Sequence, residues 1–190
     1  METLERLWNL ADTEAERTNV KPASVFEPIG LILVRPLQNM GYTSTPRNSS
    51  TFAHTGGDGV HYGLVHLEGK VSSDSPVVMT VPMNFDTENM IVGSSLHEFL
   101  CLGCEVGYFF LEQLTYEDSR SETIHLIYHP EEWFEQNYGD PELEADAQQI
   151  RCLLDLLRIE FQFKPWEQCE RKLAELQRQF RSLLDIRPSD

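Results

Sequence analysis

The middle of the sequence consists of short apolar runs separated by turns rich in glycine. Residues 60–67 (VHYGLVHL) and 77–83 (VVMTVPM) each have the length of one strand. The turn TGGDG joins a strand that enters over residues 50–53 to the first run. Between the two runs, a turn signal at Glu68–Gly69 leads to Lys70–Val71, and the polar loop SSDSP follows. Strands joined in this way pair with their sequence neighbours in antiparallel fashion, so the pattern predicts a β-meander.

Other segments extend this pattern at both ends. Residues 29–36 (IGLILVRP) predict a buried strand that Pro36 closes, and residues 123–128 (TIHLIY) predict a further strand. Residues 2–18 have the apolar spacing of an amphipathic helix.

The C-terminal part of the chain has helical spacing over residues 142–161 and 166–184. We therefore predict an α+β fold with an antiparallel or mixed central sheet flanked by helices. At 190 residues, the length favours a single domain over 1–190, with the C-terminal amphipathic helices of residues 142–186 packed on it.

The segment GSSLHEFLCLGCEVGYFFLEQL predicts a helix that begins at Ser94 or Ser95. Glu98 follows Ser95 at the spacing of a capping box. Gly103 and Gly107 each weaken a helix interior by about 1 kcal/mol relative to alanine. We expect a bend or two helices here.

The formal net charge of −16 bears on the partners of the protein. So acidic a chain repels nucleic acid and anionic lipid, and a basic protein is the partner its field favours. The sequence has neither an apolar run long enough to cross a membrane nor the pattern of a signal peptide, and we expect a cytoplasmic monomer or weak dimer.

Residues 53–62 (AHTGGDGVHY) combine turn-forming and titratable residues. Gly56, Gly57 and Gly59 permit positive φ angles, and Asp58 completes a D-G step that is typical of a tight hairpin. We interpret these four residues as a structural turn.

The same stretch supports a competing hypothesis. His54, Asp58 and His61 are residue types that serve a hydrolase or a transferase, with or without a metal ion. Their spacing matches no known metal or phosphate motif. We therefore rank this hypothesis second, and we expect neither a metal ion nor another cofactor.

Cys101 and Cys104 form a C-x-x-C step. The step lies inside the predicted helix, where the field of the helix terminus no longer lowers a thiol pKa, and no second pair completes a zinc site. Buried, reduced thiols are the simpler interpretation. A Cys–His pair of either cysteine with His61 or His97 remains an alternative.

Residues 131–146 contain seven acidic residues and no Lys or Arg. Aromatic side chains stand among the carboxylates. This mixture is typical of a solvated charged surface, and it also suits a surface that docks a basic partner. The candidate partner-binding residues are Glu131, Glu132, Trp133, Glu135, Tyr138 and Asp140.

Residues 50–102 resemble the SUKH superfamily, which includes bacterial toxin-immunity proteins, the Syd protein and fungal cell-wall regulators. The resemblance rests on STFAHTGGDGVHYGLV, GKVSSDSPVVMTVP and GSSLHEFLCLG, which match a turn, a hairpin arm and the helix after the sheet. It implies an α+β interaction module without catalytic residues. The leading hypothesis is a non-catalytic protein-binding module, such as an immunity protein that masks a basic toxin.

Overall fold

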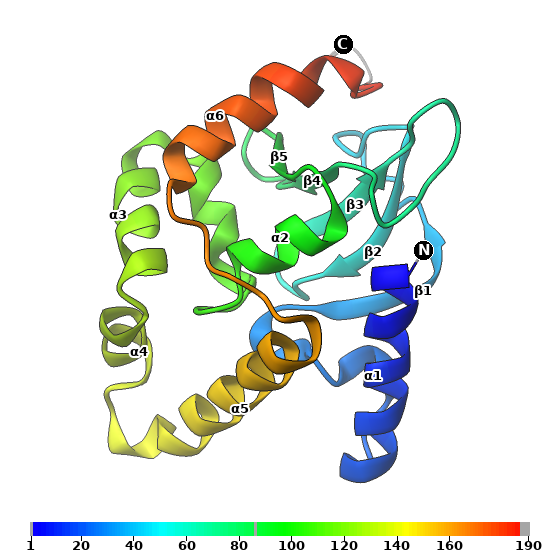
Figure 1. The fold of residues 1–190 in the computed structure, drawn as a ribbon. Coiled ribbons are helices and arrows are strands. Elements are labelled where there is room, and N and C mark those ends of the chain that lie inside the picture. The colour runs from blue at the N-terminus through cyan, green and yellow to red at the C-terminus, as the bar shows by residue number, and fades with distance from the viewer. Residues whose placement is uncertain (1, 86, 187–190) are drawn as a thin grey trace.

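The computed structural model describes residues 2–85 and 87–186, and its centre is a five-stranded antiparallel sheet (Figure 1). The strands are β1 (Ile32–Gln38), β2 (Ser49–His54), β3 (His61–Val65), β4 (Val77–Thr80) and β5 (Asn89–Gly93). They lie in the sheet in chain order, each antiparallel to the next. The predicted α+β class and the meander are confirmed.

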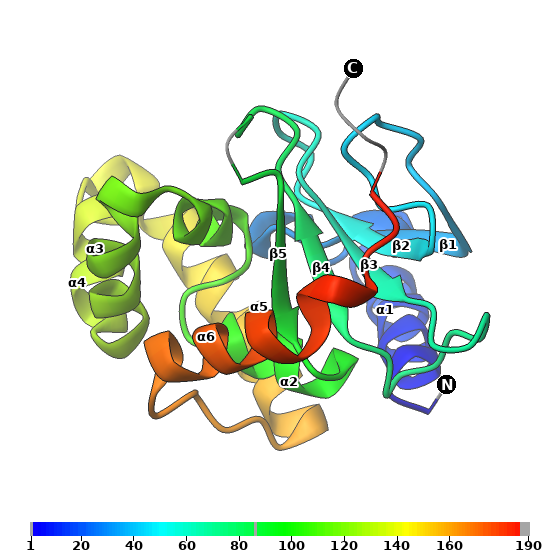
Figure 2. The same cartoon turned by 90° about the horizontal axis from the view of Figure 1, so that it is seen from above.

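The helices surround this sheet. They are α1 (Glu2–Thr18), α2 (Leu96–Leu102), α3 (Glu117–Tyr128), α4 (Pro130–Tyr138), α5 (Glu144–Phe161) and α6 (Cys169–Phe180). Helices α3 and α4 lie on the opposite side of the molecule from α1 in both views, while α6 runs along β5 (Figures 1 and 2). Among the described residues, no helix has both the length and the apolar character required to cross a bilayer.

Strand β1 continues beyond Pro36, so the prediction that this proline closes the strand is wrong. Proline lacks a backbone N–H and cannot donate to a neighbouring strand. Because β1 is an edge strand, paired with β2 on one side, this donor is not needed. The pairing is irregular between Leu33 and Gln38, where the register shifts.

The prediction of a strand over residues 123–128 is also wrong, because these residues form the second half of α3. The side chains that α3 buries are Thr123, Leu126 and Ile127, at the i, i+3, i+4 spacing of a helix. The run of β-branched and aromatic residues resembled a strand, but packing selected the helical period. Strand β5, which the sequence interpretation missed, pairs with β4 and completes the sheet.

The helix predicted from Ser94 divides into two. Ser95 Oγ accepts a hydrogen bond from the Glu98 N–H (3.1 Å) as predicted for the cap, and α2 ends at Leu102. A Cβ on Gly103 would lie 2.5 Å from the Tyr108 ring, and Gly107 has a φ of +86°. The chain turns there and resumes as the 3₁₀ helix η3 (Phe109–Thr115), which confirms the expected break.

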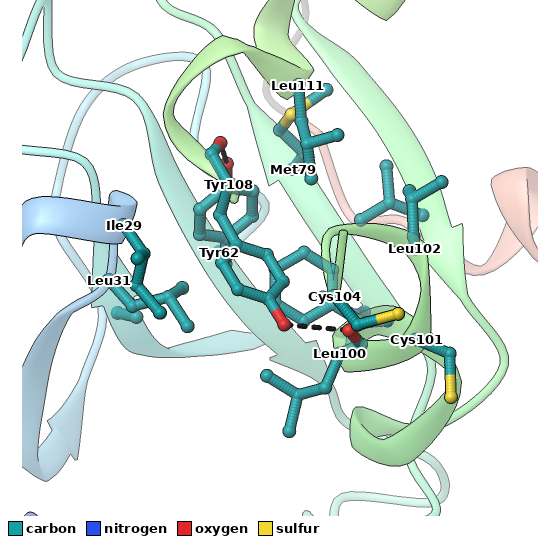
Figure 3. Packing of buried hydrophobic residues seen from close by; sticks show 14 of the residues in the cluster. Ile29, Leu31, Tyr62, Met79, Leu100, Cys101, Leu102, Cys104, Tyr108 and Leu111 are labelled. Carbon is teal, nitrogen blue, oxygen red and sulfur yellow. Dashed lines mark hydrogen bonds between the residues drawn. The ribbon is translucent and has the colours of Figure 1, made fainter. Parts of the chain in front are cut away.

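The buried hydrophobic side chains form one cluster between the sheet and the helices. Figure 3 shows Tyr108 lying across Tyr62, with its hydroxyl directed toward α2. That hydroxyl donates to the Leu100 carbonyl (2.7 Å), and the Tyr62 hydroxyl donates to the Tyr108 carbonyl. These bonds tie β3, the segment before η3 and α2 together.

Candidate functional site

The turn between β2 and β3 is built by backbone geometry. Thr55 N–H donates to the Val60 carbonyl (3.0 Å), and Val60 N–H donates to the Gly57 carbonyl (3.0 Å). The positive φ angles are +88° at Gly56, +48° at Asp58 and +73° at Gly59. Gly57 has no positive φ angle, so the prediction of that role for it is wrong, and a Cβ there would make only ordinary van der Waals contact with the Phe109 ring (3.5 Å). The turn therefore reverses the chain and packs beneath Phe109.

His61 is fully engaged by its surroundings. Its Nε2 lies 3.0 Å from Thr45 Oγ1, and its Nδ1 lies 2.7 Å from the Gly59 carbonyl. The ring stacks on Tyr42, with 5.7 Å between centroids. Burial lowers the pKa of His61, an effect that the Gly59 carbonyl partly opposes. This is the environment of a neutral structural histidine.

The three residues of the hydrolase hypothesis do not form a common site. His54 lies opposite His61 on the neighbouring strand, and burial lowers its pKa despite the opposing charge of Glu27. Asp58 is exposed on the turn. Among the described residues, the His, Cys and carboxylate groups close enough to share an ion do not include these three.

A cysteine–histidine contact exists in α2. Cys101 Sγ lies 3.7 Å from His97 Nδ1, beside Lys172, at a pocket of about 390 Å³. Burial raises the pKa of Cys101, although the Lys164 backbone and Lys172 oppose this shift. The thiol form is a weak nucleophile, so this contact resembles packing more than catalysis.

A pocket rich in aromatic side chains lies between the 3₁₀ helix η2 (Glu27–Ile29), η3, α4 and α5, and has a volume of about 400 Å³. Its lining includes Glu27, Ile29, Phe109, Phe110, Trp133 and Tyr138. The Trp133 ring packs at a tilt against Phe110 (5.5 Å between centroids) and Tyr138 (5.6 Å) and is itself buried. Phe109 is 56% exposed and stands at the rim. We call this the aromatic pocket.

One carboxylate, Glu27, lines the aromatic pocket, and other carboxylates act on nearby titratable groups. Burial raises the pKa of Tyr138, and the charge of Asp146 adds to the effect. Burial also raises the pKa of Glu112, where Gln113 opposes the shift and Asp58 adds to it. In the part of the chain that the structure describes, no Lys or Arg lines this pocket.

The structure separates the six candidate partner-binding residues. Trp133 and Tyr138 line the aromatic pocket, but the Trp133 ring belongs to its base and presents no free anchor. Glu131 and Glu132 lie at the start of α4, beside His129. Glu135 is exposed, and Asp140 caps the 3₁₀ helix η4 (Pro141–Leu143) by accepting from Glu142 N–H (2.9 Å). Their partner-binding role stays a prediction.

The sequence interpretation missed Phe109 and Phe110 as site residues. The run of three aromatic residues after Gly107, Tyr108 to Phe110, was the available signal, because successive side chains in a helical turn point in different directions. Phe110 packs inward on Trp133 while Phe109 is left at the surface.

Comparison of the chain with protein-family models, with curated proteins and with solved structures found no match.

Proposed function

We propose that this protein is a non-catalytic protein-binding module of the SUKH kind, which docks a basic segment of its partner at the aromatic pocket. The observation that carries the proposal is the combination in that pocket of an exposed aromatic rim, a buried aromatic base and a carboxylate in the wall. Phe109 at the rim is 56% exposed, and Glu27 stands in the wall.

The chemistry of this pocket selects its ligand. Aromatic faces attract Arg and Lys side chains, and the apolar stems of those side chains fill an apolar hollow while the charged heads reach carboxylates at its edge. The net charge of −16 adds a long-range field that speeds the encounter with a basic partner. Nucleic acid and anionic membranes would be repelled by the same field.

We further propose that the partner is a basic toxin, so that the protein acts as an immunity protein. A protein that masks a basic toxin needs an acidic docking surface and no catalytic group of its own. The net charge of −16 and Glu27 in the pocket wall agree with this requirement. The proposed compartment is the cytoplasm, because the four cysteines are free and thiols stay reduced there.

The test is a pull-down from the native host followed by titration of the recovered partner. Phe109→Ser and Glu27→Lys should each weaken binding at least about tenfold, because they remove the rim anchor or reverse a wall charge. Ile159→Ser is the matched control, since Ile159 is 77% exposed on α5 and does not line the pocket.

Raising the salt concentration from about 0.05 M to about 0.5 M should weaken the complex, because salt screens exposed charges. Recovery of no partner, a partner insensitive to salt, or equal losses in all three variants would contradict the proposal. Protection of cells that co-express a recovered toxin would support the immunity function specifically.

A further inference from the structure

Helices α3 and α4 meet at a corner where imidazole and carboxylate groups converge. His125 is in the last turn of α3, His129 is the residue between the two helices, and Glu131 and Glu132 are in the first turn of α4. Ligand atoms of His129, Glu131 and Glu132 all lie within 4.8 Å of one another. We call these four residues the corner cluster.

One pair of ligand atoms in the corner cluster is spaced nearly as two ligands of one metal ion are. His129 Nδ1 lies 3.6 Å from Glu131 Oε1. Two ligand atoms on one tetrahedral Zn²⁺ ion are about 3.3 Å apart when each bond is about 2.0–2.1 Å long. Small side-chain rotations would therefore bring these atoms onto one ion.

Backbone hydrogen bonds hold the corner in place without a ligand. His129 N–H donates to the His125 carbonyl (3.0 Å), and Glu132 N–H donates to the His129 carbonyl (3.0 Å). Pro130 occupies the first turn of α4. Its fixed φ angle suits that position and stiffens the connection between the helices.

A second set of contacts orients one ligand. The Nε2–H of His125 donates to Glu132 Oε2 (3.0 Å). The ring centroids of His125 and His129 lie 4.3 Å apart. Partners that hydrogen-bond to metal ligands in this way fix their orientation and raise metal affinity. Among the described residues, no Lys or Arg pairs with either glutamate and competes for its charge.

We propose that the corner cluster binds a divalent transition-metal ion of the Zn²⁺ type through His129, Glu131 and Glu132, with His125 orienting Glu132. Imidazole and carboxylate together suit zinc, whereas a set of oxygen ligands alone would suit magnesium or calcium. The ligand side chains are 45% exposed at His129, 71% at Glu131 and 46% at Glu132, so a fourth position faces solvent. The site is separate from the aromatic pocket and does not depend on the proposed function.

We expect no metal ion from the sequence because the spacing of His54, Asp58 and His61 matches no metal motif. The strand predicted over residues 123–128 would also keep His125 away from His129. In a strand, His125 and His129 would be about 13 Å apart. In a helix they lie about one turn apart, near 6 Å. Because residues 123–128 are helical and not extended as predicted, His125 and His129 lie close enough to belong to one cluster.

The test is equilibrium dialysis of the full chain against ZnCl₂, in a Cys152→Ser background that removes the exposed thiol. One Zn²⁺ per chain is expected. His129→Ala, and separately Glu132→Gln, should weaken this binding at least about tenfold, and His125→Ala should weaken it less than ligand removal does.

Glu135→Gln is the matched control, because it removes the same charge from the same helix outside the cluster. Unchanged binding in this control supports a defined site. Absence of stoichiometric Zn²⁺, binding that survives His129→Ala, or an equal loss in Glu135→Gln would overturn the proposal. All four altered side chains are exposed or half-exposed, and circular dichroism can check that each variant folds.

Discussion

The side-chain amide of Gln177 hydrogen-bonds to both backbone groups of Ile91 at the edge of the sheet. Ile91 N–H donates to Gln177 Oε1 (2.9 Å), and Gln177 Nε2 donates to the Ile91 carbonyl (2.7 Å). One residue of α6 thus takes the place of a sixth strand beside β5. Unpaired edge strands invite association with other chains, and this contact covers the edge.

Replacing Gln177 by alanine should lower the free energy of unfolding by about 1–3 kcal/mol, because it leaves the N–H and C=O of Ile91 without partners. Gln179→Ala is the control, since Gln179 is exposed on the same helix, and it should change stability by no more than about 0.5 kcal/mol. Urea denaturation measures both. Equal stabilities of the two variants would contradict the role of Gln177.

Acid should destabilise the protein through its buried histidines. Burial lowers the pKa of both His54 and His61 in the folded state, so the unfolded chain binds more protons. Stability is therefore complete above the unfolded value of about 6.5 and falls as the pH decreases through it, by at most about 1.4 kcal/mol per unit for each group.

The check is the free energy of unfolding measured from about pH 7.5 to about pH 5.5 in wild type and His61→Gln. The free energy of unfolding of His61→Gln should fall less steeply with decreasing pH than that of wild type, whatever its value at neutral pH. His66→Gln serves as the control for removal of a histidine. A decline as steep in His61→Gln as in wild type would show that His61 is not responsible.

Two glycines with similar backbone angles allow the cost of backbone strain to be distinguished from the cost of steric crowding. Gly30 has a φ of +79° and Gly69 a φ of +74°. A Cβ on Gly30 would lie 2.3 Å from the Phe109 backbone nitrogen, whereas nothing lies within 4 Å of a Cβ on Gly69. Gly69→Ala should cost about 1–2 kcal/mol from backbone strain alone. Gly30→Ala should cost more than about 3 kcal/mol and displace η3 at the aromatic pocket. Similar losses of stability in the two variants, measured by thermal or urea unfolding, would contradict the close contact between Gly30 and Phe109.

The thiols should differ in reactivity toward a thiol reagent. Cys152 is exposed, whereas Cys101, Cys104 and Cys169 are buried. Burial raises the pKa of Cys104 and of Cys169 to about 12, and the pKa of Cys101 is raised as well.

The native protein should therefore show one rapidly reacting thiol, which Cys152→Ser removes, and four after denaturation. The rate of labelling near neutral pH is the measurement. Rapid labelling of Cys101 would instead support a nucleophilic Cys101–His97 pair.

Local patterns predicted those parts of the fold whose signals are contained in a few neighbouring residues. The glycines and Asp58 specify a reversal between β2 and β3, and Ser95 specifies a helix start, since both depend on backbone conformation nearby. Residues 123–128 show the limit of such patterns. Their composition favours a strand, but the packing of Thr123, Leu126 and Ile127 favours a helix.

The candidate sites depended on longer-range relationships. The aromatic pocket joins η2 and η3 to α4 and α5, and the sequence carries no mark of which aromatic rings meet across that distance. The corner cluster needed α3 to be helical before its two histidines could approach.

The sequence by itself determined the acidic charge, the antiparallel meander in the middle of the chain and the reversal between β2 and β3, because these follow from composition and short-range backbone preferences. Only the tertiary structure decided that Phe109 stands at the rim of a pocket, that Gln177 covers β5, and that His129 meets Glu131 and Glu132. Such contacts form when burial of apolar surface brings distant segments together, and that energy depends on the whole core.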